Sequence, residues 1–207
     1  MRSVDNIMEK ICHHAAQAIR RYVEISGMTP GDMPESFLGA YVFDKIGSEV
    51  TMTLETNTTK LFDWNNASKG RRRASDAVKV ELQNAVTSVD QSGRIDLVLF
   101  DGASQNKEHE EFLALVEFKR WHLSREDRDK LLVVLKYIDT CPTGAICSIL
   151  DLGGDRSWVE HEQSDAVRMG DRWIECKVGE LPHGIPGNYS VCARIFSSAI
   201  APSLKVA

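Results

Sequence analysis

The sequence lacks several features that would place it in a class at once. No apolar run approaches the ~20 residues that a membrane-spanning helix needs. The N-terminus, "MRSVDNIMEKICHHAAQ", spreads its charges instead of placing a basic start before an apolar block. Internal repeats and low-complexity tracts are also missing. We therefore expect neither a membrane protein nor a secreted one, and predict a cytoplasmic location.

Cysteine is present but provides no disulfide framework. The five cysteines are odd in number and include no closely spaced pair of the kind that holds zinc. Cys12 stands beside His13 and His14, but adjacent helix positions point in different directions, so we expect no metal site there. We predict reduced, mostly buried thiols. These thiols belong to Cys12, Cys141, Cys147, Cys176 and Cys192.

Excess positive charge is missing as well, with one local exception. The formal net charge of −5 argues against a surface coated for nonspecific nucleic-acid binding, which needs clustered Lys and Arg. The exception is "KGRRRAS", which follows the polar "WNNASKG" and is predicted to lie in a loop. Its four basic residues either form a solvated loop or contact phosphate. They are Lys69, Arg71, Arg72 and Arg73.

Apolar spacing predicts two helices near the N-terminus. Residues 3–26 carry apolar side chains at helical intervals, which indicates one buried face. The stretch "GMTPGDMP" ends this helix. Pro34 stands where the first residue of a second helix would be, and Gly47 would close that helix. Glu35 then falls in its first turn.

The remaining apolar runs predict a sheet with a crossover helix. "SEVTMTLETN" alternates as a half-buried strand does, whereas "GRIDLVLFDG", "LALVEFKRW" and "GAICSILD" indicate interior strands. A short helix is expected around 78–89, and "SREDRDKLLVVLKYID" predicts a crossover helix with an apolar face through Leu131, Leu132, Leu135 and Ile138. Two more strands fall within 171–198, and 155–170 is too mixed to assign. We predict one α/β domain over 1–207, with a core at about 34–150 and a central mixed β-sheet flanked by α-helices.

Two opposite charges enter the apolar strand "LALVEFKRW". Because successive strand residues alternate faces, Glu117 and Lys119 point the same way and Phe118 points to the other side. If Phe100 faces Phe112 in an antiparallel pair, position 96 lies opposite position 116. Asp96 is therefore expected beside Glu117.

Two neighbouring carboxylates and an amine on one patch call for a cation. Carboxylates repel each other, and a buried carboxylate resists ionisation. Oxygen ligands from one or two carboxylates, with other positions left to water and phosphate, suit Mg²⁺ or the similar Mn²⁺. Lys119 could then orient or help deprotonate a water and stabilise charge on a phosphoryl oxygen.

A glutamate on an early helix, then "RID", then "EFK" on the next strand resembles the PD-(D/E)XK nuclease superfamily. The resemblance runs from about Glu35 to Leu150 and implies a restriction-endonuclease-like core with a mixed sheet. It departs from the family pattern at Ile95, where the name-giving proline would stand. The resemblance also implies that the main chain of Phe118 faces the metal. The side chains that it assigns to the site are Glu35, Asp96, Glu117 and Lys119.

Each of these residues also has an ordinary interpretation. Glu35 could serve only the helix dipole, in which case Glu55 is its substitute. Asp96 could pair with Arg94, and Glu117 with Lys119 could form a plain ion pair on a strand edge. Lys130, in the crossover helix, is expected to be solvated.

The leading hypothesis is a metal-dependent nuclease that acts by attack of a metal-activated water, with DNA as the expected substrate and RNA as the alternative. The basic cluster would hold the backbone without reading sequence. No separate DNA-reading domain is visible, so specificity would come from loops, a homodimer or a partner protein. The alternatives are an inactive nuclease-like binding or assembly module, and an unrelated hydrolase of small phosphorylated substrates.

Overall fold

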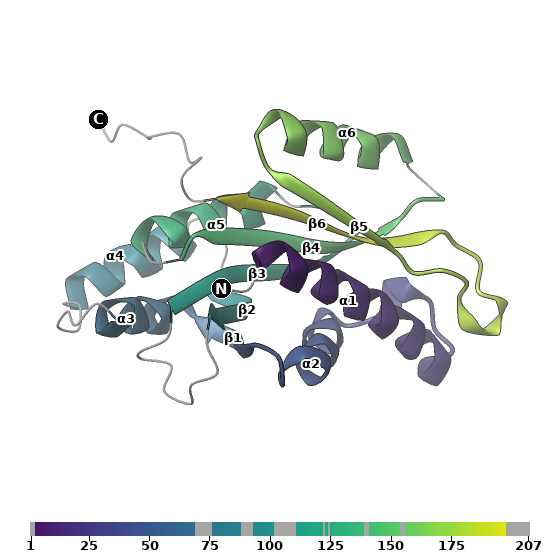
Figure 1. The fold of residues 1–207 in the computed structure, drawn as a ribbon, viewed down its shortest axis with the longest axis horizontal. Coiled ribbons are helices and arrows are strands. Elements are labelled where there is room, and N and C mark those ends of the chain that lie inside the picture. Colours follow the sequence, from purple (N-terminus) through teal and green to yellow (C-terminus); the bar gives the residue numbers. More distant parts are fainter. Residues whose placement is uncertain are drawn as a thin grey trace.

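A six-stranded mixed sheet forms the centre of the computed structural model (Figure 1), which describes residues 3–68, 76–87, 93–101, 111–121, 123, 125–138, 141–153 and 156–197. The strand order is β1-β2-β3-β4-β6-β5. β3 and β4 are parallel, and every other neighbouring pair is antiparallel. The strands are β1 (Thr51–Asn57), β2 (Arg94–Asp101), β3 (Glu111–Arg120), β4 (Thr143–Asp151), β5 (Arg172–Lys177) and β6 (Tyr189–Ser197).

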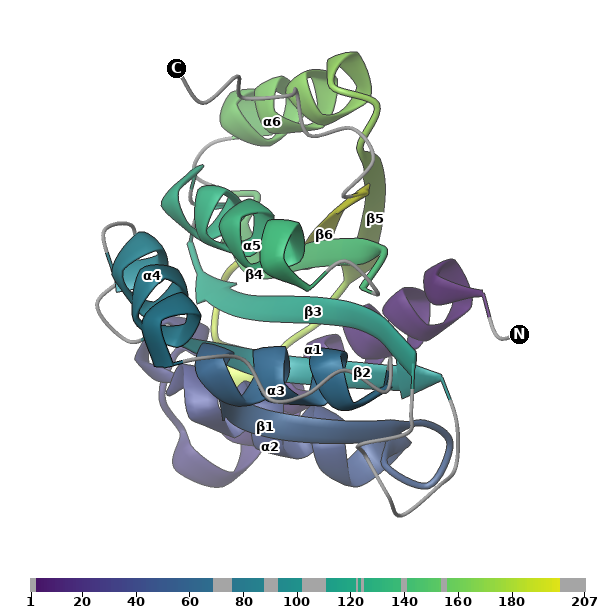
Figure 2. The same cartoon turned by 90° about the vertical axis from the view of Figure 1, so that its left-hand side faces the viewer.

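Helices cover both faces of the sheet. The first face carries α1 (Val4–Ser26) and α2 (Glu35–Ile46), joined through the 3₁₀ turn η1 (Pro30–Asp32). The second face carries α3 (Thr58–Ser68), α4 (Asp76–Thr87) and α5 (Arg125–Tyr137), which lie toward the viewer in Figure 2. A further helix, α6 (Arg156–Arg168), packs over Leu150 and Cys192, and η3 (Pro182–Gly184) precedes β6. Each face has its own apolar cluster.

These layers confirm the prediction of an α/β chain with a mixed sheet between helices. α5 connects the parallel strands β3 and β4, as the crossover interpretation required. α1 buries the face that its apolar spacing predicted, including Ile7, Ile11 and Ile19. Cys12, Cys141, Cys147 and Cys192 are buried free thiols, and Cys176 is partly buried.

Several local predictions need correction. No helix was predicted between the half-buried strand and the helix around 78–89, but "WNNAS" belongs to α3, where Leu61 and Asn65 are buried and the Asn57 carboxamide accepts the Thr59 N–H at 2.9 Å at the helix start. Pro34 is the residue before α2 rather than its first residue. The unassigned 155–170 segment contains the whole of α6, and Val134 rather than Leu132 lies on the buried face of α5.

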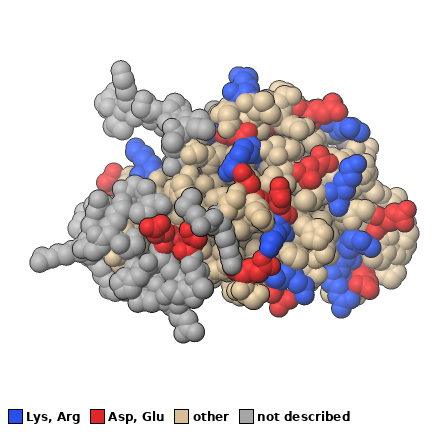
Figure 3. All heavy atoms as spheres, viewed as in Figure 1, with Lys and Arg blue, Asp and Glu red and all other residues tan. Residues whose placement is uncertain are grey.

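One face of the molecule can be examined for clustered charge. On the face in Figure 3, acidic and basic side chains of the described residues are interspersed. The predicted basic cluster, Lys69 with Arg71, Arg72 and Arg73, lies outside the described residues. Within the part of the chain that is described, no helix has both the length and the apolar character needed to cross a membrane.

Candidate functional site

The site forms where β2 and β3 stop pairing. From Phe100↔Phe112 the register shifts by one residue at a bulge, so that Leu99 pairs with Ala114 and the ladder ends at Leu97↔Val116. Continued by one step, this register sets Asp96 opposite Glu117. The predicted Phe100↔Phe112 pair is therefore correct, and the bulge supplies the one-residue shift that separated position 116 from Glu117.

The Asp96 carboxylate takes the place of a main-chain partner at this end of the ladder. Its Oδ2 accepts the Phe118 main-chain N–H at 2.8 Å. In a continuous sheet, the Phe118 N–H would donate to a main-chain carbonyl of β2. Here a side chain accepts it instead. This bond fixes Asp96 against β3. A metal contact of the Phe118 main chain stays a prediction.

Glu117 and Lys130 form a buried ion pair. Both side chains are 1% exposed, and Lys130 Nζ lies 2.7 Å from Glu117 Oε1. The same ammonium donates to the Arg94 carbonyl at 3.0 Å, on the strand that has parted from β3. The expectation that Lys130 is solvated is therefore wrong, because α5 turns this residue inward to fill the gap between the two strands.

The environment of Glu117 favours its neutral form. Burial raises its pKa, and the neighbouring Asp96 charge raises it further. Lys130 and Lys119 act in the opposite direction, but the net pKa of Glu117 stays well above the ordinary value for glutamate. The site thus holds a carboxylate for which a further positive charge nearby would be favourable.

Lys119 lies on the same side of β3 as Glu117, as predicted. Its Nζ is 3.2 Å from Asp127 Oδ1 on α5 and 4.0 Å from Glu117 Oε2. Burial alone lowers the pKa of Lys119, but attraction to Asp127, Glu117, Asp96 and Glu35 outweighs it, and the pKa is raised. Lys119 is therefore an ammonium at neutral pH and suits charge stabilisation better than proton abstraction.

Glu35 reaches the site from the opposite face of the sheet. Its Oε1 accepts the Arg120 main-chain N–H at 3.2 Å and lies 3.8 Å from Arg120 Nε. Its charge also contributes to the raised pKa of Lys119. Glu55, the substitute, is exposed, has a left-handed backbone (φ 49°) and lines a groove of about 670 Å³ at the β1 edge. The four predicted side chains therefore gather around the end of β3.

The donor set fits one kind of metal site. Among the described residues, no group of three or more His, Cys, Asp or Glu side chains is arranged to hold a metal ion. Asp96 and Glu117 remain as a pair of hard oxygen donors, which is what Mg²⁺ needs when water and phosphate complete its shell. A metal-ligand role for Glu35 stays a prediction.

Asp127, Lys130 and Arg120 contact the site residues but were not assigned to the site from the sequence. Asp127 and Lys130 lie three positions apart on α5, and the buried Val134 follows Lys130 by four, so Asp127 and Lys130 share the face of α5 that packs on the sheet. That spacing is the signal that could have identified them. Arg120 gave no such signal, because its partner Glu35 is 85 positions away.

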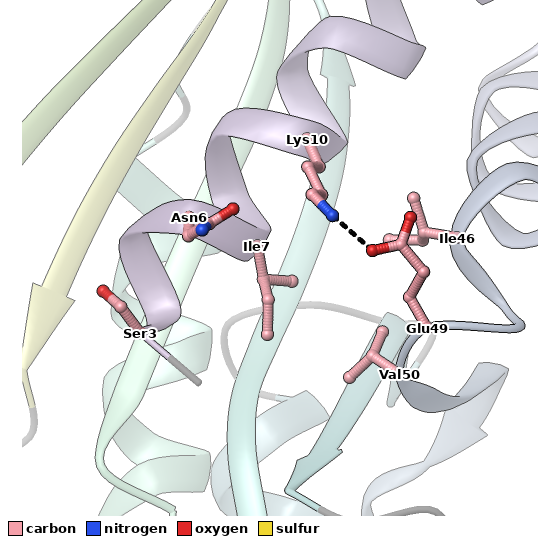
Figure 4. Close-up of a pocket in the computed structure, with 7 residues that line it drawn as sticks. All are labelled: Ser3, Asn6, Ile7, Lys10, Ile46, Glu49 and Val50. Atoms are coloured by element: carbon pink, nitrogen blue, oxygen red, sulfur yellow. Dashed lines mark hydrogen bonds and ion pairs between the residues drawn. The ribbon is translucent and has the colours of Figure 1, made fainter. Parts of the chain in front are cut away.

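A separate cavity of about 280 Å³ lies between the start of α1 and the segment after α2 (Figure 4). Lys10 and Glu49 form an ion pair beside Ile7, Ile46 and Val50. None of the predicted site residues lines this cavity, so it is not part of the candidate site.

Comparison of the chain with protein-family models, curated proteins and solved structures finds no match. The geometry around Asp96 and Glu117 is therefore the basis for assigning a function.

The raised pKa of Glu117 predicts a pH-dependent stability. The folded chain holds the Glu117 proton more tightly than the unfolded chain, so the stability that Glu117 contributes is fully present below the ordinary pKa of 4.5 and is lost as pH rises through the folded value. Each unit of difference is worth about 1.4 kcal/mol. In chelator, we expect Glu117→Gln to remove this decrease and leave a curve that is flat or rises with pH.

The measurement is denaturant unfolding between about pH 5 and pH 8. Glu111→Gln, which alters an exposed glutamate on the same strand, is the matched control. Parallel curves for the parent chain and Glu117→Gln would show that Glu117 does not titrate in this range.

Proposed function

We propose that this chain is a metal-dependent phosphodiesterase that hydrolyses nucleic acid, with DNA as the preferred substrate. The observation that carries the proposal is the position of the Asp96 carboxylate beside Glu117, just beyond the last pair of the β2–β3 ladder. Lys119 beside them provides a fixed positive charge. The restriction-endonuclease-like interpretation of the fold belongs to the same proposal.

Each side chain has a defined part in this chemistry. A bound Mg²⁺ or Mn²⁺ would supply Lewis-acid activation of water and phosphate. Asp96 and Glu117 would hold it, and the Phe118 N–H keeps Asp96 in position. The Lys119 ammonium, oriented by Asp127, stabilises negative charge on a phosphoryl oxygen.

The remaining assignments complete the proposal. Glu35 adds negative charge near the site and fixes Arg120. The basic cluster would hold the nucleic-acid backbone. Any sequence specificity would come from loops, a second copy of the chain or a partner protein. The basic cluster consists of Lys69, Arg71, Arg72 and Arg73.

One observation favours the second candidate, an inactive binding or assembly module. The Lys130 ammonium already lies against Glu117 and supplies positive charge where a dication would bind. In a module that had lost its metal, the Lys130 ammonium would take the place of the dication at Glu117.

Metal titration separates the two candidates. We expect Mg²⁺ and Mn²⁺ to bind the parent chain in calorimetry, and Asp96→Asn to weaken binding at least about 100-fold because a direct oxygen ligand loses its charge. Asp63→Asn is the control, since Asp63 is a part-buried aspartate paired with Lys79 outside the site. Equal heats for all three proteins, or none for the parent chain, would support the inactive module.

The activity assay follows directly. The parent chain is incubated with plasmid and with single-stranded DNA and RNA, in Mg²⁺, in Mn²⁺ and in chelator. We expect cleavage with either metal and none in chelator. Hydrolysis of small phosphate esters without cleavage of nucleic acid would instead indicate an unrelated hydrolase of small phosphorylated substrates.

A further inference from the structure

The two edge strands of the sheet differ in how they are protected. β1 stands at one end of the strand order and β5 at the other (Figure 2). Native proteins protect an edge against pairing with another chain by placing charged side chains on it. Of the six residues of β5, Arg172, Glu175 and Lys177 are charged, whereas Glu55 is the one charged residue of β1. β1 is therefore the less protected edge.

The groove at the β1 edge follows this strand. It has a volume of about 670 Å³ and is lined by the strand from Met52 to Asn57. Phe43 of α2, with a side chain that is 38% exposed, lines it from one face of the sheet, and Lys60 and Trp64 of α3 line it from the other. An edge strand directs alternate main-chain N–H and C=O groups away from the sheet. The groove therefore suits an added extended strand.

The sequence of β1 is self-complementary about Thr53. If two copies of β1 pair antiparallel across a twofold axis at Thr53, Met52 lies opposite Leu54 of the second copy and Thr53 lies opposite itself. Met52 and Leu54 both pack on the apolar face that α1 and α2 cover, so apolar side chains meet there. Threonine opposite threonine is a favourable cross-strand pair. Glu55 faces Thr51 of the second copy and not another carboxylate.

The charges at the two ends of β1 also fit a second copy. Lys60 and Arg94 lie beside its C-terminal end, where Glu55 offsets one of the two positive charges. Asp101 and Glu111 pair with each other beside its N-terminal end. Antiparallel pairing of two copies brings the basic end of each against the acidic end of the other, whereas parallel pairing would bring like charges together.

We propose that β1 is a dimerisation edge, to which β1 of a second copy of this chain adds antiparallel, so that the two sheets become one. The same patch serves both copies, and the assembly therefore closes at two. The exposed Phe43 ring, which lines the groove, is covered in the dimer. The inference concerns a surface outside the candidate site and depends on neither metal nor cleavage. A strand from an unrelated protein at the same edge is the competing outcome.

Sedimentation velocity over a range of protein concentrations, in chelator, measures the association. The parent chain should be a dimer. Thr53→Lys should weaken dimerisation at least about 30-fold, because the twofold axis sets two ammonium groups opposite each other. Thr53→Glu should do the same by opposing two carboxylates. An equimolar mixture of the two variants should recover the dimer, because lysine then faces glutamate.

Controls separate the interface from folding. Both Thr53 variants lose the hydrogen bond between the Thr53 and Thr56 hydroxyls, so their thermal midpoints are measured beside the association. Phe43→Ser removes an exposed ring outside the strand and should also weaken the dimer. Lys177→Glu reverses a charge on the β5 edge and should leave the dimer unchanged.

Three results would overturn the inference. The first is a monomeric parent chain, even one that binds a peptide strand at β1. The second is a parent dimer that persists in Thr53→Lys and in Phe43→Ser, since it would lie on another surface. The third is a mixture of Thr53→Lys and Thr53→Glu that stays monomeric, since Thr53 would then not face its own copy. None of these results bears on the phosphodiesterase, which the cleavage assay tests separately.

Discussion

Lys119→Ala is expected to lower the rate of nucleic-acid cleavage about 100- to 1,000-fold, the loss typical when one preorganised donor to a developing negative charge is removed. The pKa of Lys119 is raised, so its ammonium is present throughout the neutral range. The measurement is single-turnover cleavage of a labelled oligonucleotide at saturating Mg²⁺, which separates chemistry from binding.

Metal affinity should survive this substitution. Lys119 Nζ is 4.0 Å from Glu117 Oε2 and donates no ligand, so calorimetry should give a similar Mg²⁺ affinity for the variant. Lys79→Ala is the matched control, because Lys79 is also a partly buried lysine paired with an aspartate. Full activity in Lys119→Ala would remove Lys119 from the mechanism.

The distinction between ammonium and amine also sets the expected pH profile. If Lys119 acted by removing a proton, cleavage would rise with pH through its raised pKa. As a charge stabiliser it is already in its active form at neutral pH, and Lys119→Arg should retain part of the activity. This assignment narrows the sequence-based expectation, which left both roles open.

The charged patch on β3 could be predicted because strand alternation is a strict rule. Glu117 and Lys119 both face α5, whereas Phe118 joins the apolar cluster on the α1 side. Alternation depends only on local backbone geometry, so it can be read from nine residues. The position of Asp96 beside Glu117 was predicted with one further assumption, that β2 and β3 pair in antiparallel orientation.

The bulge at Leu99 and Phe100 could not be predicted from the same pattern. Leu113 and Ala114 are both apolar, so an extra residue at this point leaves the hydrophobic sequence equally plausible in either register. The helix α3 was not predicted, for a related reason. Asn65 and Asn66 favour turns in isolation, but packing against the sheet overrides that preference.

The prediction that Lys130 is solvated was the largest error in the site. A lysine on a polar-looking helix is usually solvated, and α5 is rich in charge over its first turns. What buries Lys130 is the gap between β2 and β3, where the Arg94 carbonyl and Glu117 both need a donor. That gap exists only in the folded sheet.

Lys130→Met is expected to destabilise the metal-free chain by about 3–5 kcal/mol, because it leaves Glu117 buried without its ammonium partner and the Arg94 carbonyl without its donor. Denaturant unfolding in chelator at neutral pH measures this loss. Lys136→Met, which alters an exposed lysine in the last turn of the same helix, should change stability by about 0.5 kcal/mol or less.

A double variant tests whether the loss comes from the isolated charge. Lys130→Met with Glu117→Leu replaces the whole buried pair by apolar groups, which is often close to neutral for stability. The double variant should therefore be more stable than Lys130→Met alone. If the two are equally unstable, the cost lies in the packing of α5 and not in an unpaired Glu117.

Lys130→Met also tests whether the Lys130 ammonium competes with a metal ion for Glu117. Lys130 supplies positive charge at the carboxylate that a dication would use, so its removal should strengthen Mg²⁺ binding and let saturating Mg²⁺ restore part of the lost stability. Unfolding of Lys130→Met is followed with Mg²⁺ and with chelator, beside Lys136→Met. Recovery only in Lys130→Met means that amine and metal compete for Glu117, whereas no recovery means that the buried pair is structural and that Glu117 holds no metal.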